Sequence, residues 1–159
     1  MISIIIVTFN SAAHIGRCLA SLPAAGSGPV ECLVVDNAST DGTVAEVRKF
    51  PQVKLIASTQ NLGFAGGCNR GAQEASGDVL LFLNPDTELR STLDKLAQTF
   101  ASRPDCMAAG AKLVDAQGRP QHGFLVRRFP TTLSLLLEIV LVRSEEHTSE
   151  LQSHHDLVC

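Results

Sequence analysis

Short apolar runs that each stop at a small polar cluster constrain the fold of this chain more than any other feature. Continuous runs of Val, Ile and Leu are typical of strands buried on both faces, as in a parallel sheet covered by helices. In open α/β sheets, ligands bind just beyond the carboxyl ends of the strands. Thr8, Asp36 and Asp86 all occupy such ends, so we expect one ligand site to contain them. The runs are Ile4-Ile-Ile-Val-Thr-Phe-Asn10, Leu33-Val-Val-Asp-Asn-Ala-Ser-Thr-Asp-Gly42 and Val79-Leu-Leu-Phe-Leu-Asn-Pro-Asp86.

Helix-length segments separate these runs. Alternating strands and helices predict right-handed βαβ units, and therefore an α/β fold with a Rossmann-like, mostly parallel sheet flanked by helices. After residue 105 the pattern weakens to a short strand or two within 107–114 and a turn at 115–118. We expect strands at 3–8, 31–36, 53–57 and 78–83, and helices at 11–22, 41–50, 65–76, 91–102 and 132–142.

The composition fits one globular domain and excludes some functions. With 159 residues, of which 45% are hydrophobic, the chain can bury a sizeable core. Its net charge of -3 provides no basic surface, so we expect no nucleic-acid partner. The five cysteines form no Cys-x-x-Cys pair, which indicates reduced thiols and a cytoplasmic location. The apolar stretch 133–142 contains Glu138 and is far shorter than the roughly 20 residues that a membrane helix needs.

The last residues differ in kind from the rest of the chain. Arg143-Ser-Glu-Glu-His-Thr-Ser-Glu-Leu-Gln-Ser153 matches the conceptual translation of a common short-read sequencing adapter, and Asp156-Leu-Val-Cys159 matches its continuation. We therefore interpret 143–159 as an artefactual, disordered tail, and 1–142 as the first part of a domain whose natural reading frame continues. This origin and the irregular spacing also argue against a zinc site formed by His147, His154, His155 and Cys159.

The polar clusters after the first two strands allow a structural and a functional interpretation. Asn10 can cap the following helix, but capping does not explain Thr8 at the end of a buried strand. Asp36 directly follows a buried strand, where an unpaired carboxylate is costly and needs a hydrogen-bond donor. A nucleobase N–H or a ribose hydroxyl would serve as that donor.

The run Asn61-Leu-Gly-Phe-Ala-Gly-Gly-Cys-Asn-Arg-Gly71 leads into the third predicted helix. Its glycines permit a tight turn at Gly63 and suit a phosphate at a helix N-terminus, although they can equally serve close helix packing. Arg70 can pair with a phosphate or lie on a solvated helix face. At the end of the fourth strand, Asp86 can bind a hard divalent cation or form a turn.

Taken together, these clusters resemble the nucleotide-sugar-binding half of the family 2 glycosyltransferases with the GT-A fold, and in particular their rhamnosyltransferase-like branch. The resemblance covers roughly 2–142 and is carried by the motifs at 3–10, 34–42, 61–67 and 83–89. It implies an incomplete GT-A fold that binds a nucleotide-diphospho-sugar donor. The family's usual metal motif is Asp-x-Asp, whereas this chain has Asn84-Pro-Asp86. The residues that it places at the nucleotide-sugar are Thr8, Asn10, Asp36, Asn61, Gly63 and Arg70, with Asp86 on Mg²⁺ or Mn²⁺.

The resemblance also implies a reaction and its partners. Such enzymes transfer a sugar with inversion to a saccharide or lipid-linked acceptor in cell-surface polysaccharide assembly, in the cytoplasm or peripherally at the inner face of the plasma membrane. The family's catalytic base lies in an acidic segment after the metal motif, and we find no such segment before Val142. We therefore expect the fragment to bind a nucleoside diphosphate without turnover.

Three alternatives remain open. A truncated nucleotide-binding domain without activity fits the same motifs. A haloacid dehalogenase-like phosphatase would carry Asp-x-Asp on one strand, whereas Asn37 and Ala38 follow Asp36 here. An NAD-binding domain would carry a glycine-rich turn after the first strand, and 8–14 contains no glycine.

Overall fold

A computed structural model of the chain describes residues 1–22 and 28–121. The helix expected at 132–142 and the tail expected at 143–159 lie outside the described residues. The chain divides into two compact units with a boundary between Ala111 and Lys112. The first unit contains all the predicted site residues.

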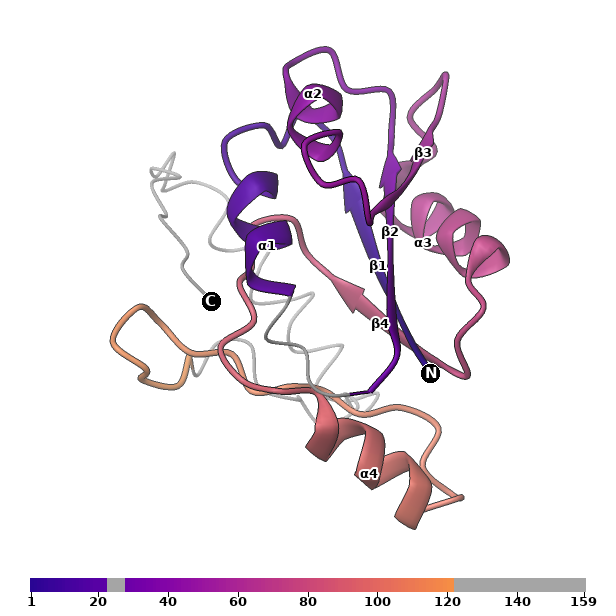
Figure 1. Ribbon diagram of the computed structural model, residues 1–159, viewed down its shortest axis with the longest axis vertical. Helices are drawn as coiled ribbons and strands as arrows, with labels where there is room; N and C mark the ends of the chain where they lie inside the picture. Colours follow the sequence, from indigo (N-terminus) through magenta and orange to yellow (C-terminus); the bar gives the residue numbers. More distant parts are fainter. Residues whose placement is uncertain (23–27, 122–159) are drawn as a thin grey trace, which may run out of the picture. The chain divides into compact units, whose positions relative to one another are not determined.

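The first unit is built on a four-stranded parallel sheet in the order β3-β2-β1-β4, as the apolar runs predict. The register aligns Thr8 at the end of β1 with Asp36 at the end of β2. It also aligns Ile6 of β1 with Leu83, the last residue of β4, so the residues after β4 leave the sheet at the same edge (Figure 1). The strands are β1 (Ile2–Thr8), β2 (Val30–Asp36), β3 (Lys54–Ala57) and β4 (Val79–Leu83).

The helices occur where the sequence predicts them, but their ends differ. α1 begins four residues later than expected, because the carbonyl of Ser11 accepts the N–H groups of His14 and Ile15 in a preceding turn. α3 begins two residues earlier than expected, because the Asn61 side chain accepts the N–H of Gly63 at 2.8 Å and starts the helix there. The helices are α1 (Ile15–Ser21), α2 (Thr43–Val47), α3 (Gly63–Glu74) and α4 (Asp94–Ser102).

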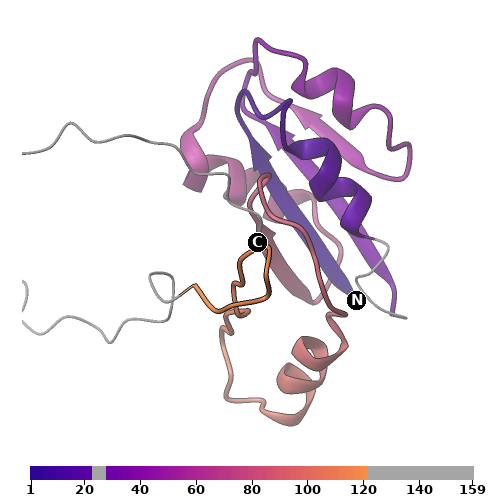
Figure 2. The same ribbon diagram turned by 90° about the vertical axis from the view of Figure 1, so that its left-hand side faces the viewer.

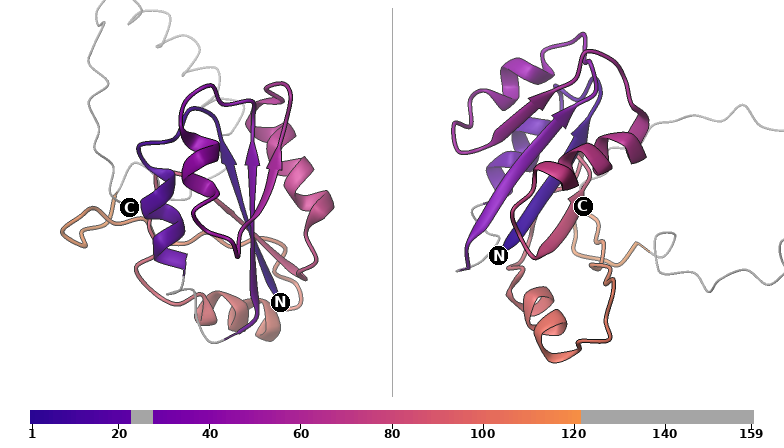
Figure 3. Two further views of the ribbon diagram at one scale, coloured as in Figure 1. Left: turned by 45° about the horizontal axis from the view of Figure 1, so that its top comes forward. Right: turned by 90° about the vertical axis from the view of Figure 1, so that its right-hand side faces the viewer.

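Helices cover both faces of the sheet. α1 and α2 lie on one face and α3 on the other, while α4 lies at the end where the strands begin (Figures 1 and 2). The α1 and α2 side holds the main apolar cluster, which includes Ile4, Ile6 and Val34 of the sheet. On the other face, α3 approaches the sheet so closely that a Cβ on Gly67 would lie 2.6 Å from a methyl group of Val7 (Figure 3). The glycine spacing in α3 therefore serves close packing.

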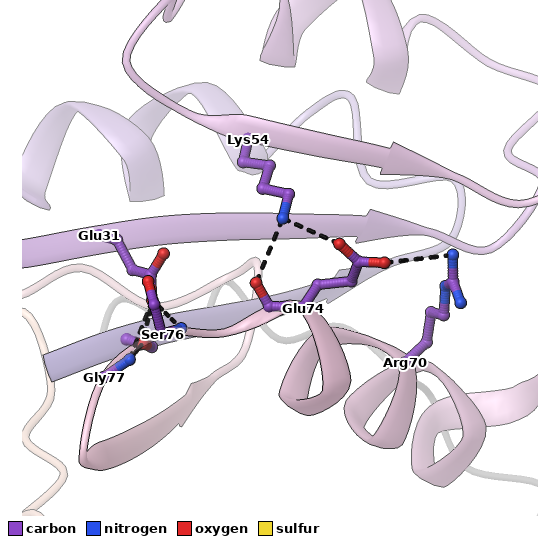
Figure 4. A network of polar contacts seen from close by, with 7 residues as sticks. Glu31, Lys54, Arg70, Glu74, Ser76 and Gly77 are labelled. Carbon is purple, nitrogen blue, oxygen red and sulfur yellow. Dashed lines mark hydrogen bonds and ion pairs between the residues drawn. The ribbon is translucent and has the colours of Figure 1, made fainter.

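The Glu31 carboxylate joins three segments of the chain at the end of the sheet opposite to the predicted site. Glu31 near the start of β2 accepts the hydroxyl of Ser3, the N–H of Ser76 at 2.5 Å and the N–H of Gly77 at 3.1 Å (Figure 4). These bonds join β1, β2 and the loop between α3 and β4. They hold the pKa of Glu31 well below its usual range, at about 2, with the Ser3 hydroxyl as the largest cause.

The remaining described residues contain the expected turn. The carbonyl of Asp115 accepts the N–H of Gly118 at 2.9 Å, and Val114 forms a single bridge with Pro120. The strand expected within 107–114 is wrong apart from this bridge. Within the described ranges, no helix is both long and apolar enough to cross a membrane. The described cysteines are free thiols, as expected.

Candidate functional site

A buried hydrogen bond joins the ends of the two central strands. The hydroxyl of Thr8 donates to Oδ1 of Asp36 over 3.1 Å, and the two residues are 0% and 2% exposed. The second carboxylate oxygen, Oδ2, accepts the N–H of Ser39 at 3.0 Å. The donors that Asp36 requires thus come from the protein. Each carboxylate oxygen retains a lone pair that can accept a further bond from a ligand.

Asn10 connects two loops rather than capping its own helix. Its backbone has a positive φ of 50°, its N–H donates to the Ser39 hydroxyl over 2.9 Å, and its Oδ1 accepts the N–H of Thr40 at 2.9 Å. The cap expected on α1 is wrong, since that helix has no side-chain cap. Nearby, the Ala12 N–H donates to Asp41 over 3.1 Å. The loops after β1 and β2 are therefore held together as one surface.

Asn37 is a member of this region that the sequence analysis did not assign. It is 2% exposed, and its N–H donates to the carbonyl of Thr8 over 2.8 Å. Its Nδ2 donates to the carbonyl of Gly63 over 3.0 Å, and its Oδ1 accepts the N–H of Leu62 at 3.4 Å. Asn37 therefore attaches the first turn of α3 to the end of β2. Its place directly after Asp36 at the end of a buried strand was the only available signal.

Asp86 lies after β4 with a buried, unpartnered oxygen. Its Oδ1 is shielded from solvent and has no hydrogen-bond partner among the residues that the structure describes. Because an unsatisfied buried carboxylate oxygen is costly, this atom points to a missing ligand. The loop is fixed on α1, where the Ser21 hydroxyl accepts the N–H of Leu89 at 2.9 Å and the Cys18 thiol contacts the carbonyl of Asn84 at 3.7 Å. Burial raises the pKa of Cys18 to about 12, so this thiol remains protonated.

The residues present fit a divalent cation that is shared with a ligand. Across the described ranges, no group of three or more His, Cys, Asp or Glu side chains could hold an ion by itself. A hard cation bound by a diphosphate needs only one or two protein carboxylates, since phosphate oxygens and water complete its coordination. Asp86 supplies one such carboxylate with a free oxygen.

Arg70 does not join the other predicted residues. Its guanidinium pairs with Glu74 at 3.5 Å in the second half of α3, and the same carboxylate accepts Lys54 at 2.9 Å (Figure 4). Lys54 is also the main cause of the low pKa of Glu74. The phosphate contact expected of Arg70 remains a prediction.

Two exposed aromatic rings lie next to residues of the site. Phe9 follows Thr8 directly and is 51% exposed, and Phe64 in the first turn of α3 is 60% exposed. The sequence analysis did not assign either ring to the site.

Comparison with known proteins identifies the family to which this arrangement belongs. The profile of Glycosyl transferase family 2 matches residues 3–148. The chain belongs to this family. It is 34% identical over 131 residues to N-acetylglucosaminyl-diphospho-decaprenol L-rhamnosyltransferase of Mycobacterium tuberculosis. The aligned region covers 74% of this chain and 43% of that protein. The chain thus spans less than half the length of this relative.

Solved structures of similar proteins share the fold. A Staphylococcus aureus TarS fragment in complex with UDP is 30% identical with a TM-score of 0.63, covering 79% of this chain and 39% of that one. The mannosyltransferase PcManGT of Pyrobaculum calidifontis, in complex with GDP-Man and Mn²⁺, is 26% identical with a TM-score of 0.60, covering 72% of this chain and 35% of that one. The GT-A fold and the family expected from the motifs are confirmed.

Proposed function

We propose that this glycosyltransferase chain binds a nucleotide-diphospho-sugar at the carboxyl edge of its sheet, together with Mg²⁺ or Mn²⁺. The observation that carries the proposal is the unpartnered Oδ1 of Asp86. Asp86 follows β4, and the chain leaves β4 at the same edge of the sheet as the Thr8–Asp36 pair. The complexes of TarS with UDP and of PcManGT with GDP-Man and Mn²⁺ support this class of ligand.

Different strand ends serve different parts of the donor. The remaining lone pairs of Asp36 accept a base N–H or a ribose hydroxyl, and Thr8 keeps this carboxylate in place. The exposed ring of Phe9 offers a flat apolar surface against which a base can stack. Asn61 and Gly63 shape the first turn of α3, and Asn10 orients the loop that follows Asp36.

Asp86 serves the diphosphate end of the donor. A divalent cation bound there would neutralise negative charge on the departing nucleoside diphosphate. The hydrogen bond from Leu89 to Ser21 holds the loop of Asp86 on α1, so that its carboxylate is positioned before any ligand arrives.

Transfer with inversion requires an acceptor hydroxyl and a carboxylate that removes its proton. We propose a saccharide or lipid-linked acceptor in cell-surface polysaccharide assembly, reached in the cytoplasm or peripherally at the membrane. The name of the mycobacterial relative, which contains a diphospho-decaprenol, supports a lipid-linked acceptor. We also propose that the chain as given binds the donor without turnover, because Asp115 follows the metal motif too closely to be the base. A nucleotide-binding domain without activity is therefore the second candidate.

Calorimetric titration of the full 159-residue chain with UDP, GDP and dTDP, each with and without Mn²⁺, tests the proposal. We expect one nucleotide to bind more tightly with Mn²⁺ than without it. In Asp86→Asn the affinity measured with Mn²⁺ should fall at least tenfold, which is the scale of one charge-assisted contact. Asp105→Asn is a matched control on an exposed carboxylate. Absence of binding by all three nucleotides, or an unchanged Mn²⁺ effect in Asp86→Asn, contradicts the proposal.

A further inference from the structure

The side chain of Asn37 bonds at both ends to the same turn. Its Nδ2 donates to the carbonyl of Gly63 and its Oδ1 accepts the N–H of Leu62, over 3.0 and 3.4 Å. Both partners belong to the first turn of α3, whereas the Asn37 backbone belongs to the end of β2 and bonds to Thr8. One residue therefore connects three segments that are distant in sequence.

The surroundings of Asn37 leave little room for other arrangements. The residue is 2% exposed, and a Cβ built on Gly67 would lie 3.3 Å from Nδ2. The turn itself is constrained, because Gly63 adopts a positive φ of 71°. The turn that carries Leu62, Gly63 and Phe64 is therefore held at a defined distance from Asp36.

We propose that Asn37 is a positioning residue for the donor, which holds the first turn of α3 beside the Thr8–Asp36 pair. The inference rests on the proposed function, since it assigns Asn37 to the nucleotide site described above. Asn37 acts through its neighbours: its side chain is buried and bonds to Gly63 and Leu62, so it orients the turn.

The chemistry requires an amide at this position. Aspartate preserves the shape and the acceptor but places a carboxylate oxygen 3.0 Å from the Gly63 carbonyl, where the two oxygens repel each other. When protonated, the same carboxyl can donate to that carbonyl and restore the bond. The hydrogen-bond partners of Asn37 from β1 and α3 are uncharged backbone groups, and the preceding residue of β2 is the charged Asp36.

The test compares Asn37→Asp with the wild-type chain in UDP titrations with Mn²⁺ from pH 8 to pH 5.5. We expect affinity to fall about tenfold at pH 8, and the deficit relative to wild type to shrink to about threefold at pH 5.5 as the new carboxyl gains a proton. The wild-type titration accounts for the pH dependence of the nucleotide and of all groups that the two chains share. Asn69→Asp on the exposed part of α3 is a matched control that adds the same charge, and it should follow the wild type.

Each result supports or overturns the inference. The inference is overturned if Asn37→Asp loses no UDP affinity relative to wild type, or if its loss is the same at all pH values. Failure of the wild-type chain to bind UDP overturns the proposed function instead. If Asn37→Asp does not fold, Asn37→Ser removes the amide without a charge. Amide hydrogen exchange of Leu62 and Gly63 in that variant, without nucleotide, should accelerate at least tenfold, and an unchanged rate overturns the inference.

Discussion

The carboxylate of Glu31 should make the stability of this fold depend on pH in the acidic range. In the native state its pKa falls from 4.5 to about 2, chiefly through the Ser3 hydroxyl and then the Ser76 N–H. A carboxylate with a lowered native pKa stabilises the fold above its unfolded pKa, and this contribution is lost as pH falls through the native value. The stabilisation is therefore complete above pH 4.5 and disappears toward pH 2.

The size of this effect follows from the shift and from the exposure of the group. A fall from 4.5 to about 2 sets an upper limit of about 3 kcal/mol. Because Glu31 is partly exposed, solvent screening reduces this limit, and we expect about 1 kcal/mol. Glu31→Gln keeps a neutral oxygen that still accepts from Ser3, Ser76 and Gly77, so it removes mainly the charge.

Urea denaturation of wild type and Glu31→Gln at intervals from pH 7 to pH 2.5 measures this contribution. We expect the variant to be about 1 kcal/mol less stable at pH 7, and the two free energies of unfolding to converge as the pH falls below 4. Glu46→Gln is a matched control, because Glu46 forms a surface ion pair with exposed Lys49 at 2.6 Å. Parallel curves for wild type and Glu31→Gln would refute the reasoning.

Two further predictions concern packing and the paired strand ends. Gly71→Ala places a methyl group against the Ile5 side chain, so we expect a loss of about 1–3 kcal/mol in urea denaturation. Gly28→Ala meets no atom of the described residues within 4 Å and should change stability little. Thr8→Val removes the hydroxyl from Asp36 at nearly constant volume, so we expect a loss of about 1–2 kcal/mol and weaker UDP binding. Unchanged UDP affinity in Thr8→Val would contradict the proposed role of the Thr8 hydroxyl in positioning Asp36.

The sheet and the position of Thr8 and Asp36 at one edge of it could be predicted from local sequence patterns, whereas the hydrogen bond between them was not predicted, because the donor to Asp36 was expected to be a ligand. Strands buried on both faces appear as continuous apolar runs, and parallel strands end at one edge. The hydrogen-bond partner of the Asn10 side chain could not be predicted in this way. Its Oδ1 accepts from Thr40, thirty residues away, and capping patterns describe only bonds to nearby backbone groups. Asn37 was missed for the same reason, because its partners lie on α3.

The topology explains why the proposed site combines residues from both sides of the sheet. The strands from β1 to β3 are added in one direction, and the chain then returns past β1 to add β4 on its other side. The Thr8–Asp36 pair therefore belongs to the β1–β2 side, and α3 is held there by Asn37. Asp86 belongs to the β4 side, where its loop is fastened by Ser21 on α1. The two parts of the proposed site are thus attached to different helices, the Thr8–Asp36 side to α3 and the Asp86 side to α1. Substitutions at Asn37 should therefore affect binding of the nucleoside, and substitutions at Ser21 should affect the contribution of the metal.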